Sequence, residues 1–173
     1  VALVSGEIIG DGGLGAFGVS KVMHYAEALT DNSQQSKLTK AAALSIGAQI
    51  VIFSGNSIGN AVAPRVAIAL NAGYVAGVTD LPEGKTYIRN VFSGKATAHV
   101  NVITETSVIT VTPNSFGNKN AGGSEASVEV FSADVGDAKV KLNGFSPTST
   151  DGVVPLPEAV RVVSAGRGLK GPE

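Results

Sequence analysis

A short apolar run that passes directly into a glycine-rich loop constrains the fold of this chain more than any other feature. Residues 49–54 read Gln-Ile-Val-Ile-Phe-Ser, and a strand that is apolar at consecutive positions is typical of a parallel sheet buried on both faces. After the loop, residues 61–71 are mostly small and apolar, and Pro64 suits the first turn of a helix. This succession of strand, loop and helix predicts an α/β domain.

The first half of the chain repeats this pattern, and the second half departs from it. Further strands are predicted at residues 1–5, 19–25 and 74–80. A helix is predicted to begin at Asp31 or Ser33 and to end at Gly47. Three alternating segments then predict an antiparallel meander, followed by one more strand, at residues 86–92, 95–103, 107–112 and 126–131. We therefore predict an α/β fold with a mostly parallel sheet flanked by helices and additional antiparallel strands.

The composition changes along the chain in a way that suggests two domains. Residues 1–134 hold the predicted α/β domain, and residues 135–158 are polar and rich in Pro, Ser and Thr, which indicates a linker. Residues 159–173 begin with a new apolar segment that passes into a glycine loop, as the first strand of a second α/β domain would. The chain has no initiator Met and stops inside this loop, so we expect a fragment of a longer protein.

Several classes of function are disfavoured by the residue counts. The chain has 13 Lys and Arg against 14 Asp and Glu and no basic run, which disfavours nucleic-acid binding. The absence of Cys excludes thiolate nucleophiles, disulfides and iron–sulfur ligation. His24 and His99 have no carboxylate beside them in sequence and are expected to be structural or surface residues, and no carboxylate pair stands out. We expect no catalytic site of its own in this chain, and no membrane span, because no apolar run reaches about 18 residues.

Two glycine-rich loops are candidate anion sites. Residues 13–18 (GLGAFG) match the dinucleotide-binding pattern, but the next segment is strand-like, so we predict a connection rather than a phosphate site. Residues 54–60 (SGNSIGN) join a strand to a helix and would suit an anion, with Arg65 adding charge. The loop lacks the Gly-Lys-Ser/Thr of a P-loop. Tight packing of the strand on the helix at Gly55 and Gly59 is the favoured explanation, and nucleotide binding remains the alternative.

The most specific motif lies close to the end of the chain. An apolar strand delivers Ser164, and Gly166 and Gly168 then leave space on either side of Arg167. Glycines allow the backbone to approach a ligand closely, and a planar guanidinium can pair with a phosphate or stack on a conjugated ring. This segment is therefore predicted to contact a cofactor.

Residues 164–170 (SAGRGLK) resemble the opening of the flavin-binding domain of the electron transfer flavoprotein alpha subunit. The family pattern is a strand followed by Ser-Gly-Gly-Arg-Gly-Leu-Lys, and Ala165 here replaces one of the glycines. Three upstream segments are also similar to the family and keep its order: residues 64–67 (PRVA), 87–96 (YIRNVFSGKA) and 115–116 (SF). The resemblance spans nearly the whole chain.

The resemblance implies a Rossmann-like or adenine-nucleotide-hydrolase-like layered fold, whose first strand and helix would precede residue 1. It implies a scaffold and interface domain in a heterodimer with a beta subunit, which carries electrons from flavin dehydrogenases to an acceptor such as a quinone oxidoreductase. It assigns FAD mainly to the C-terminal domain. Within this chain it assigns to FAD only Arg167 and the loop formed by Ser164, Gly166 and Gly168, so we expect little or no FAD here. The expected compartment is the cytoplasm of a bacterium, or the mitochondrial matrix in a eukaryote.

Two other classes of function remain open. The chain is compatible with a nucleotide-binding α/β module of the universal-stress or ATP-pyrophosphatase-like type. It is also compatible with a structural interaction domain that binds no ligand. Binding of ATP or AMP at residues 55–60 distinguishes the first of these from the electron carrier.

Overall fold

A computed structural model describes residues 1–117, 122–144 and, beyond them, residues 146, 152, 154, 156, 159–166 and 168. The chain divides into two compact units, Val1–Lys141 and Leu142–Glu173. The helices and strands of the described residues all lie in the first unit. Among the described residues, no helix is long and apolar enough to cross a membrane.

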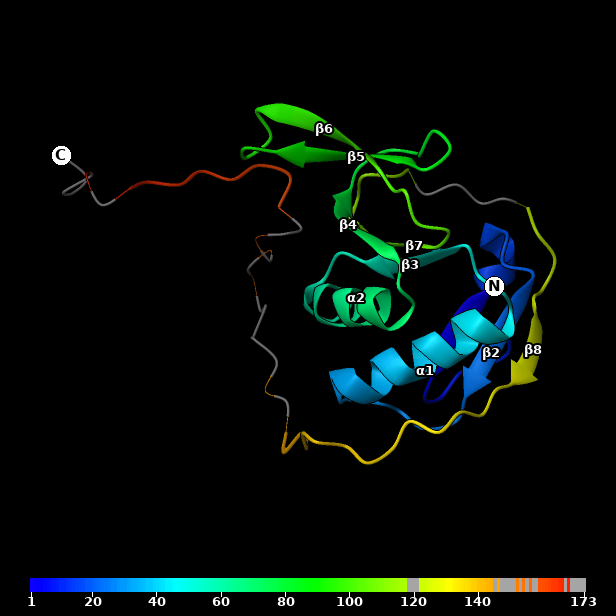
Figure 1. Cartoon of the computed structure of the whole chain (residues 1–173). Helices are drawn as coiled ribbons and strands as arrows, with labels where there is room; N and C mark the ends of the chain where they lie inside the picture. Colours follow the sequence, from blue (N-terminus) through cyan, green and yellow to red (C-terminus); the bar gives the residue numbers. More distant parts are fainter. Residues whose placement is uncertain are drawn as a thin grey trace. The chain divides into compact units, whose positions relative to one another are not determined.

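The first unit contains two sheets (Figure 1). Sheet A is parallel throughout and has the order β1-β2-β8, with bounds Ala2–Ser5, Lys21–Tyr25 and Ser127–Val130. Sheet B has the order β3-β7-β4-β5-β6, with bounds Ile50–Ser54, Ser107–Val111, Gly73–Val78, Thr86–Val91 and Ala96–Asn101. Its first three strands are parallel, and β5 and β6 are antiparallel to their neighbours. The predicted α/β class, with a mostly parallel sheet and additional antiparallel strands, is confirmed.

Two α-helices and one short 3-10 helix connect the strands, with bounds Asn32–Ser45 (α1), Ser57–Ala69 (α2) and Leu14–Phe17 (η1). Asp31 caps α1, as predicted, by accepting hydrogen bonds from the backbone N–H groups of Ser33 and Gln34. Helix α2 begins four residues earlier than residue 61, where the sequence predicted its start. The reason is Asn56, whose side chain accepts the N–H of Gly59 at 2.8 Å and so caps the helix inside the expected loop.

Strand β7 corrects the prediction of an antiparallel meander. It lies between β3 and β4 and runs parallel to both, while the antiparallel pairing is confined to β4, β5 and β6. Ser107, Val108, Ile109 and Thr110 are all buried, as expected of a central strand covered on both faces. The polar members are paired: the Thr110 hydroxyl oxygen accepts the N–H of Gly77 at 3.0 Å. The alternation of polar and apolar residues was therefore misleading, because the polar positions also lie inside.

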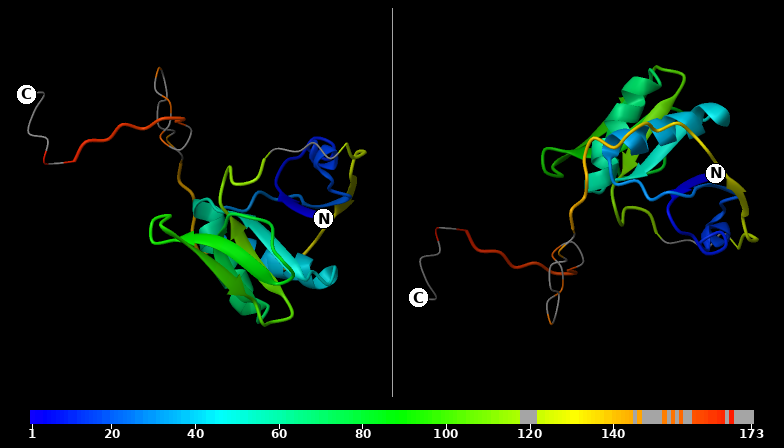
Figure 2. Two further views of the ribbon diagram at one scale, coloured as in Figure 1. Left: turned by 90° about the horizontal axis from the view of Figure 1, so that it is seen from above. Right: turned by 90° about the horizontal axis from the view of Figure 1, so that it is seen from below.

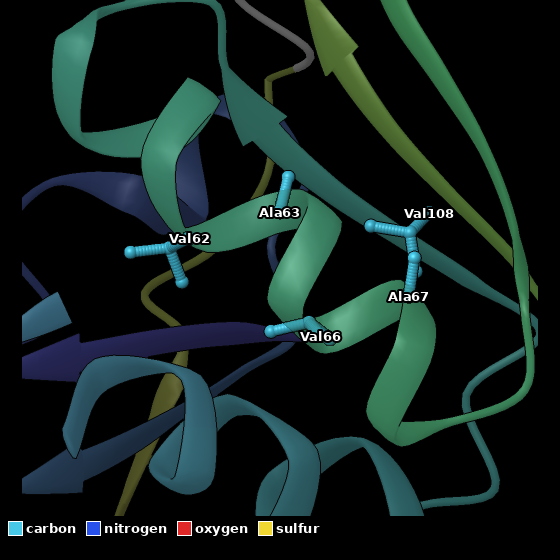
Figure 3. Packing of buried hydrophobic residues seen from close by; sticks show 5 residues of the cluster. All are labelled: Val62, Ala63, Val66, Ala67 and Val108. Atoms are coloured by element: carbon cyan, nitrogen blue, oxygen red, sulfur yellow. The ribbon is translucent and has the colours of Figure 1, made fainter. Parts of the chain in front are cut away.

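The main core lies between α2 and sheet B. Small side chains on the helix meet the central strand, in the cluster Val62, Ala63, Val66, Ala67 and Val108 (Figure 3). On the other face of the sheet, a second cluster surrounds the fully buried Tyr87 with Val75, Val78, Val102 and Ile109. A smaller third cluster of Leu29, Leu38 and Val135 lies beside α1. Figure 2 shows sheet A, in blue and yellow, at one side of this unit and the green strands of sheet B at the other.

The strand predicted at the start of residues 159–173 is not formed. The described residues 159–166 carry no strand, and Val160 and Val163 are almost fully exposed. A strand forms only when a neighbouring strand accepts and donates its backbone hydrogen bonds. No described residue of the second unit belongs to such a partner strand. The domain boundaries predicted from composition therefore stay a prediction.

Candidate functional site

The carboxyl ends of β1 and β3 and the first turn of α2 surround a cavity of about 290 Å³. Its lining includes Leu3, Ser5, Gln35, Ser54, Asn56 and Gly59. In open α/β sheets, ligands bind beyond the carboxyl ends of strands, close to a helix N-terminus. If the chain binds a nucleotide, as the alternative interpretation of residues 54–60 states, the nucleotide is expected in this cavity.

The two glycines at this cavity are required for packing. A Cβ atom on Gly59 would lie 1.9 Å from the carbonyl oxygen of Ser54, and one on Gly55 would lie 2.6 Å from that of Val111. Both distances are far inside van der Waals contact. Glycine at position 59 therefore lets α2 lie this close to β3, and glycine at position 55 lets the chain after β3 lie this close to the end of β7. Arg65 donates to the carbonyl of Ala61 in its own helix. These contacts support the packing explanation of the loop, which the sequence analysis favoured.

The loop at residues 13–18 is organised by a carboxylate that the sequence analysis did not single out. Asp11 accepts the N–H groups of Gly13 and Gly15 at 2.8 Å each, and that of Ala126 at 2.9 Å. These hydrogen bonds, the one from Ala126 first, hold the pKa of Asp11 below its ordinary value. The amides that a phosphate would use are thus already paired, and β2 follows η1 where a dinucleotide site requires a helix. An Asp directly before a glycine pair, as in Asp11-Gly12-Gly13, is the local signal that predicts such a turn.

The predicted flavin residues lie in the second unit. Ser164, Gly166 and Gly168 are exposed, and a Cβ atom on either glycine would meet no atom within 4 Å. Arg167 lies outside the described residues. The space around the two glycines fits the close approach of a ligand, and the roles of all four residues remain predictions.

Both histidines have ordinary surroundings. His24 Nε2 lies 2.7 Å from the carbonyl oxygen of Gly6, which ties the end of β2 to the end of β1. His99 is exposed on β6, where it pairs in register with Ile88. Within residues 1–117 and 122–144, and the few described after them, no group of three His, Asp or Glu residues is placed to hold a metal ion.

An apolar groove separates the free edges of the two sheets. It has a volume of about 390 Å³ and is lined by residues of β1, α1 and β3. In the described part of the chain, β1 pairs only with β2 and β3 pairs only with β7, so each presents an unpaired edge. Ile50 and Ile52 of β3 are 45% and 64% exposed, although a parallel strand of this composition is normally covered. Exposed apolar edges of this kind are typical of surfaces that another segment covers.

Further large apolar side chains are exposed around sheet B and β8. Phe92, at the turn between β5 and β6, is 80% exposed, and Ile103, which follows β6, is 93% exposed. Val130 of β8 is 82% exposed. Together with the groove, these residues give the layered α/β scaffold apolar surfaces that are suited to contact with other protein segments.

Comparison with known proteins places this scaffold in a family. Residues 1–135 match the model of the "Electron transfer flavoprotein domain", and the chain belongs to that family. It is 28% identical over 119 residues to the "Electron transfer flavoprotein subunit alpha" of Mycobacterium leprae. It is 33% identical over 122 residues to the "Probable electron transfer flavoprotein subunit alpha, mitochondrial" of Caenorhabditis elegans. Each alignment covers 69% of this chain but only 37% and 36% of the two relatives, so the chain spans about a third of their length.

Proposed function

We propose that this chain is the scaffold and interface domain of an electron transfer flavoprotein alpha subunit. The whole protein would be a heterodimer with a beta subunit, and would carry electrons from flavin dehydrogenases to an acceptor such as a quinone oxidoreductase. The observation that carries the proposal is the family match over residues 1–135, together with similarity to two alpha subunits. In this proposal the chain provides surfaces that bind its partner proteins, and it contributes no catalytic group of its own. The expected compartment is the bacterial cytoplasm, or the mitochondrial matrix in a eukaryote.

The exposed apolar residues between β5 and β8 support a partner of this kind. Phe92, Ile103 and Val130 each present most of their surface to solvent. Burying such side chains contributes roughly 1.5–3 kcal/mol each to the free energy of association before the entropy costs of binding. We propose that the beta subunit covers them. The groove between β1 and β3 is a second apolar surface, and its unpaired edges fit the further strand that the family resemblance suggests.

The cofactor proposal rests on the second unit. Arg167, with Ser164, Gly166 and Gly168 as its loop, would hold the edge of FAD, which supplies reversible uptake of one or two electrons when bound. A permanently charged guanidinium would favour the reduced, negatively charged flavin. Most of the FAD site would come from residues that this sequence does not contain, so weak or no FAD binding is expected for this chain.

Co-expression with an electron transfer flavoprotein beta subunit tests the proposal, with size-exclusion chromatography and light scattering as the measurement. The two chains are expected to elute together with the mass of one copy of each. Ile103→Asp should weaken the complex because it places a charge in the proposed contact. Ile68→Asp is the matched control, because Ile68 is also a largely exposed isoleucine, 81% against 93% for Ile103, and lies on α2. Separate elution of the unaltered chains at micromolar concentration would overturn the proposal.

Nucleotide binding is the second candidate, favoured by the cavity at the carboxyl ends of β1 and β3. Calorimetric titration with ATP and AMP tests it. The electron-carrier proposal expects no binding at millimolar nucleotide, because the glycines of that loop serve packing. Binding that Asn56→Asp weakens would establish a nucleotide module instead, since a negative charge introduced into the lining of the cavity would repel phosphate.

A further inference from the structure

The segment that follows β8 lies along the N-terminal end of α1. We call residues 131–141 the strap; it is the yellow to orange segment after β8 in Figure 1. Three polar side chains of the α1 region bind its backbone. Gln34 Nε2 donates to the carbonyl of Gly136 at 2.7 Å, Lys37 Nζ donates to that of Val135 at 3.0 Å, and Asp31 accepts two of its N–H groups.

Asp31 divides its two carboxylate oxygens between the helix and the strap. Oδ1 accepts the N–H groups of Ser33 at 2.6 Å and Gln34 at 3.4 Å. Oδ2 accepts those of Lys139 at 2.7 Å and Val140 at 2.9 Å. The side chain is only 3% exposed, so all four donors converge on a carboxylate withdrawn from water. Hydrogen bonds to an ionised group are stronger than those between neutral groups.

Capping α1 does not by itself require an acid. Ser, Thr or Asn serve as N-caps about as well, since one oxygen suffices. The second oxygen faces two N–H donors, and an amide NH₂ in its place would present donors to donors. A carboxylate is therefore required by the strap and not by the helix.

The two halves of the strap are held differently. Val135 is 6% exposed and packs with Leu29 and Leu38, so hydrophobic burial fixes the first half. Lys139 and Val140 have exposed side chains, and Val140 is 66% exposed. The second half therefore depends on backbone hydrogen bonds, of which Asp31 accepts two.

We propose that Asp31 is a latch that holds the last residues of the first unit, 137–141, at the N-terminal end of α1. With the latch closed, Asp31 holds the amide of Val140, one residue before Lys141, where the first unit ends. With the latch open, Val135 is still packed and Gly136 is still bound by Gln34, so residues 137–141 are released. Five extended residues span at most about 18 Å. The latch is independent of the electron-carrier proposal, because it rests on contacts within the first unit.

Amide hydrogen exchange, followed by NMR on the whole chain, tests the latch through Asp31→Asn. This variant keeps an oxygen for the amides of Ser33 and Gln34 but presents donors to the strap. Exchange at Lys139 and Val140 should accelerate about tenfold or more, while amides inside α1 change less than about twofold. Asp31→Ser should behave in the same way. Asp134→Asn is the matched control: Asp134 accepts the N–H of Gly136 at 2.9 Å and, among the described residues, no N–H of Lys139 or Val140, so its change should leave both latch amides as they were.

Equal protection of Lys139 and Val140 in Asp31→Asn and in the unaltered chain would overturn the proposal. If Asp31→Asn does not fold, amide exchange in the unaltered chain tests the proposal instead. The latch then requires slow exchange at Lys139 and Val140 against fast exchange at Asn143 and Gly144, and equal rates at the four amides would refute it.

Discussion

Sheet B buries complete apolar side chains on both of its faces, whereas sheet A ends in a strand, β8, whose four residues are all exposed. Val108 and Tyr87 have no exposed surface in sheet B. The segment around β8 depends in addition on two carboxylates, because buried Asp11 binds the amide of Ala126 just before it and Asp31 binds the second half of the strap after it. Hydrophobic burial is cooperative and insensitive to acid, while carboxylate hydrogen bonds are local and fail when the carboxylate is protonated. The two regions should therefore respond to different perturbations.

Truncation of Tyr87, in the core of sheet B, should lower the free energy of unfolding more than any other change described below. Tyr87→Ala removes the largest fully buried side chain of the described residues and is expected to cost about 3–5 kcal/mol of the free energy of unfolding. Chemical denaturation followed by circular dichroism measures this cost. Tyr87→Phe is the control, because no described residue pairs with the buried hydroxyl, so its loss should be neutral or stabilising. A loss below about 1 kcal/mol in Tyr87→Ala would show that sheet B does not depend on this cluster.

Val108→Ala should have a smaller effect of the same kind. The side chain lies on β7 between the helix face of Ala63 and Ala67 and the neighbouring strands (Figure 3). Losing two methyl groups from a filled site is expected to cost about 2 kcal/mol, or a fall of several degrees in Tm. Differential scanning calorimetry measures it. The whole first unit should unfold in a single transition, and a separate early transition would show that the two sheets are not cooperative.

Acid should affect the region of sheet A first. The N–H groups of Ala126, Gly15 and Gly13 lower the pKa of Asp11, and the N–H of Ser33, together with those of Lys139 and Val140, lowers that of Asp31. A folded-state pKa below the ordinary value of 3.8 means that the stabilisation is complete above the ordinary value and is lost as pH falls from there through the lower, folded-state pKa.

Amide exchange at pH 6, 4 and 3 tests this dependence. The amides of Ala126, Lys139 and Val140 should lose protection before those of β7, after correction for the intrinsic rates. If β7 loses protection at the same pH or earlier, the assignment of polar attachment to β8 and the strap is wrong.

Arg167→Ala should have the smallest effect on stability. The residue falls within the range of the second unit, so the free energy of unfolding of the first unit should change by less than about 0.5 kcal/mol. In the assembled flavoprotein the same change should lower the flavin reduction potential by tens of millivolts, since about 1–2 kcal/mol of stabilisation of the reduced anion is lost. A redox titration measures the shift. Unchanged potential and FAD affinity would show that Arg167 has no part in the cofactor site.

The features of this fold that could be predicted from the sequence are those that depend on residues close together in the chain. The cap at Asp31 and the strand at residues 50–54 follow from residue types within a few positions. The place of β7 was not predictable from such signals. Its neighbours in the sheet begin at Ile50 and Gly73, and pairing over such separations depends on the register of the complete sheet.

The same distinction applies to the candidate sites. Gly59, at the junction of β3 and α2, was correctly linked to packing of the strand on the helix because its partner Ser54 is close in sequence. Gly55 instead packs against Val111 of β7, a distant partner that the motif does not reveal. Asp11 and Asp31 were missed as attachment points because their partners at Ala126 and Lys139 lie more than a hundred residues away. An Asp before a glycine turn and an Asp at an N-cap each predict one local hydrogen bond, and neither pattern predicts the second, distant one.

The central claim is that the apolar surface of this scaffold is an interface for a beta subunit. Hydrogen exchange by mass spectrometry, on the chain alone and with a saturating amount of an electron transfer flavoprotein beta subunit, tests it most directly. The account predicts slower exchange in peptides that contain Phe92, Ile103 and Val130, and unchanged exchange in the outer turns of α2 around Ile68. Unchanged exchange throughout the chain in the presence of the beta subunit would contradict it.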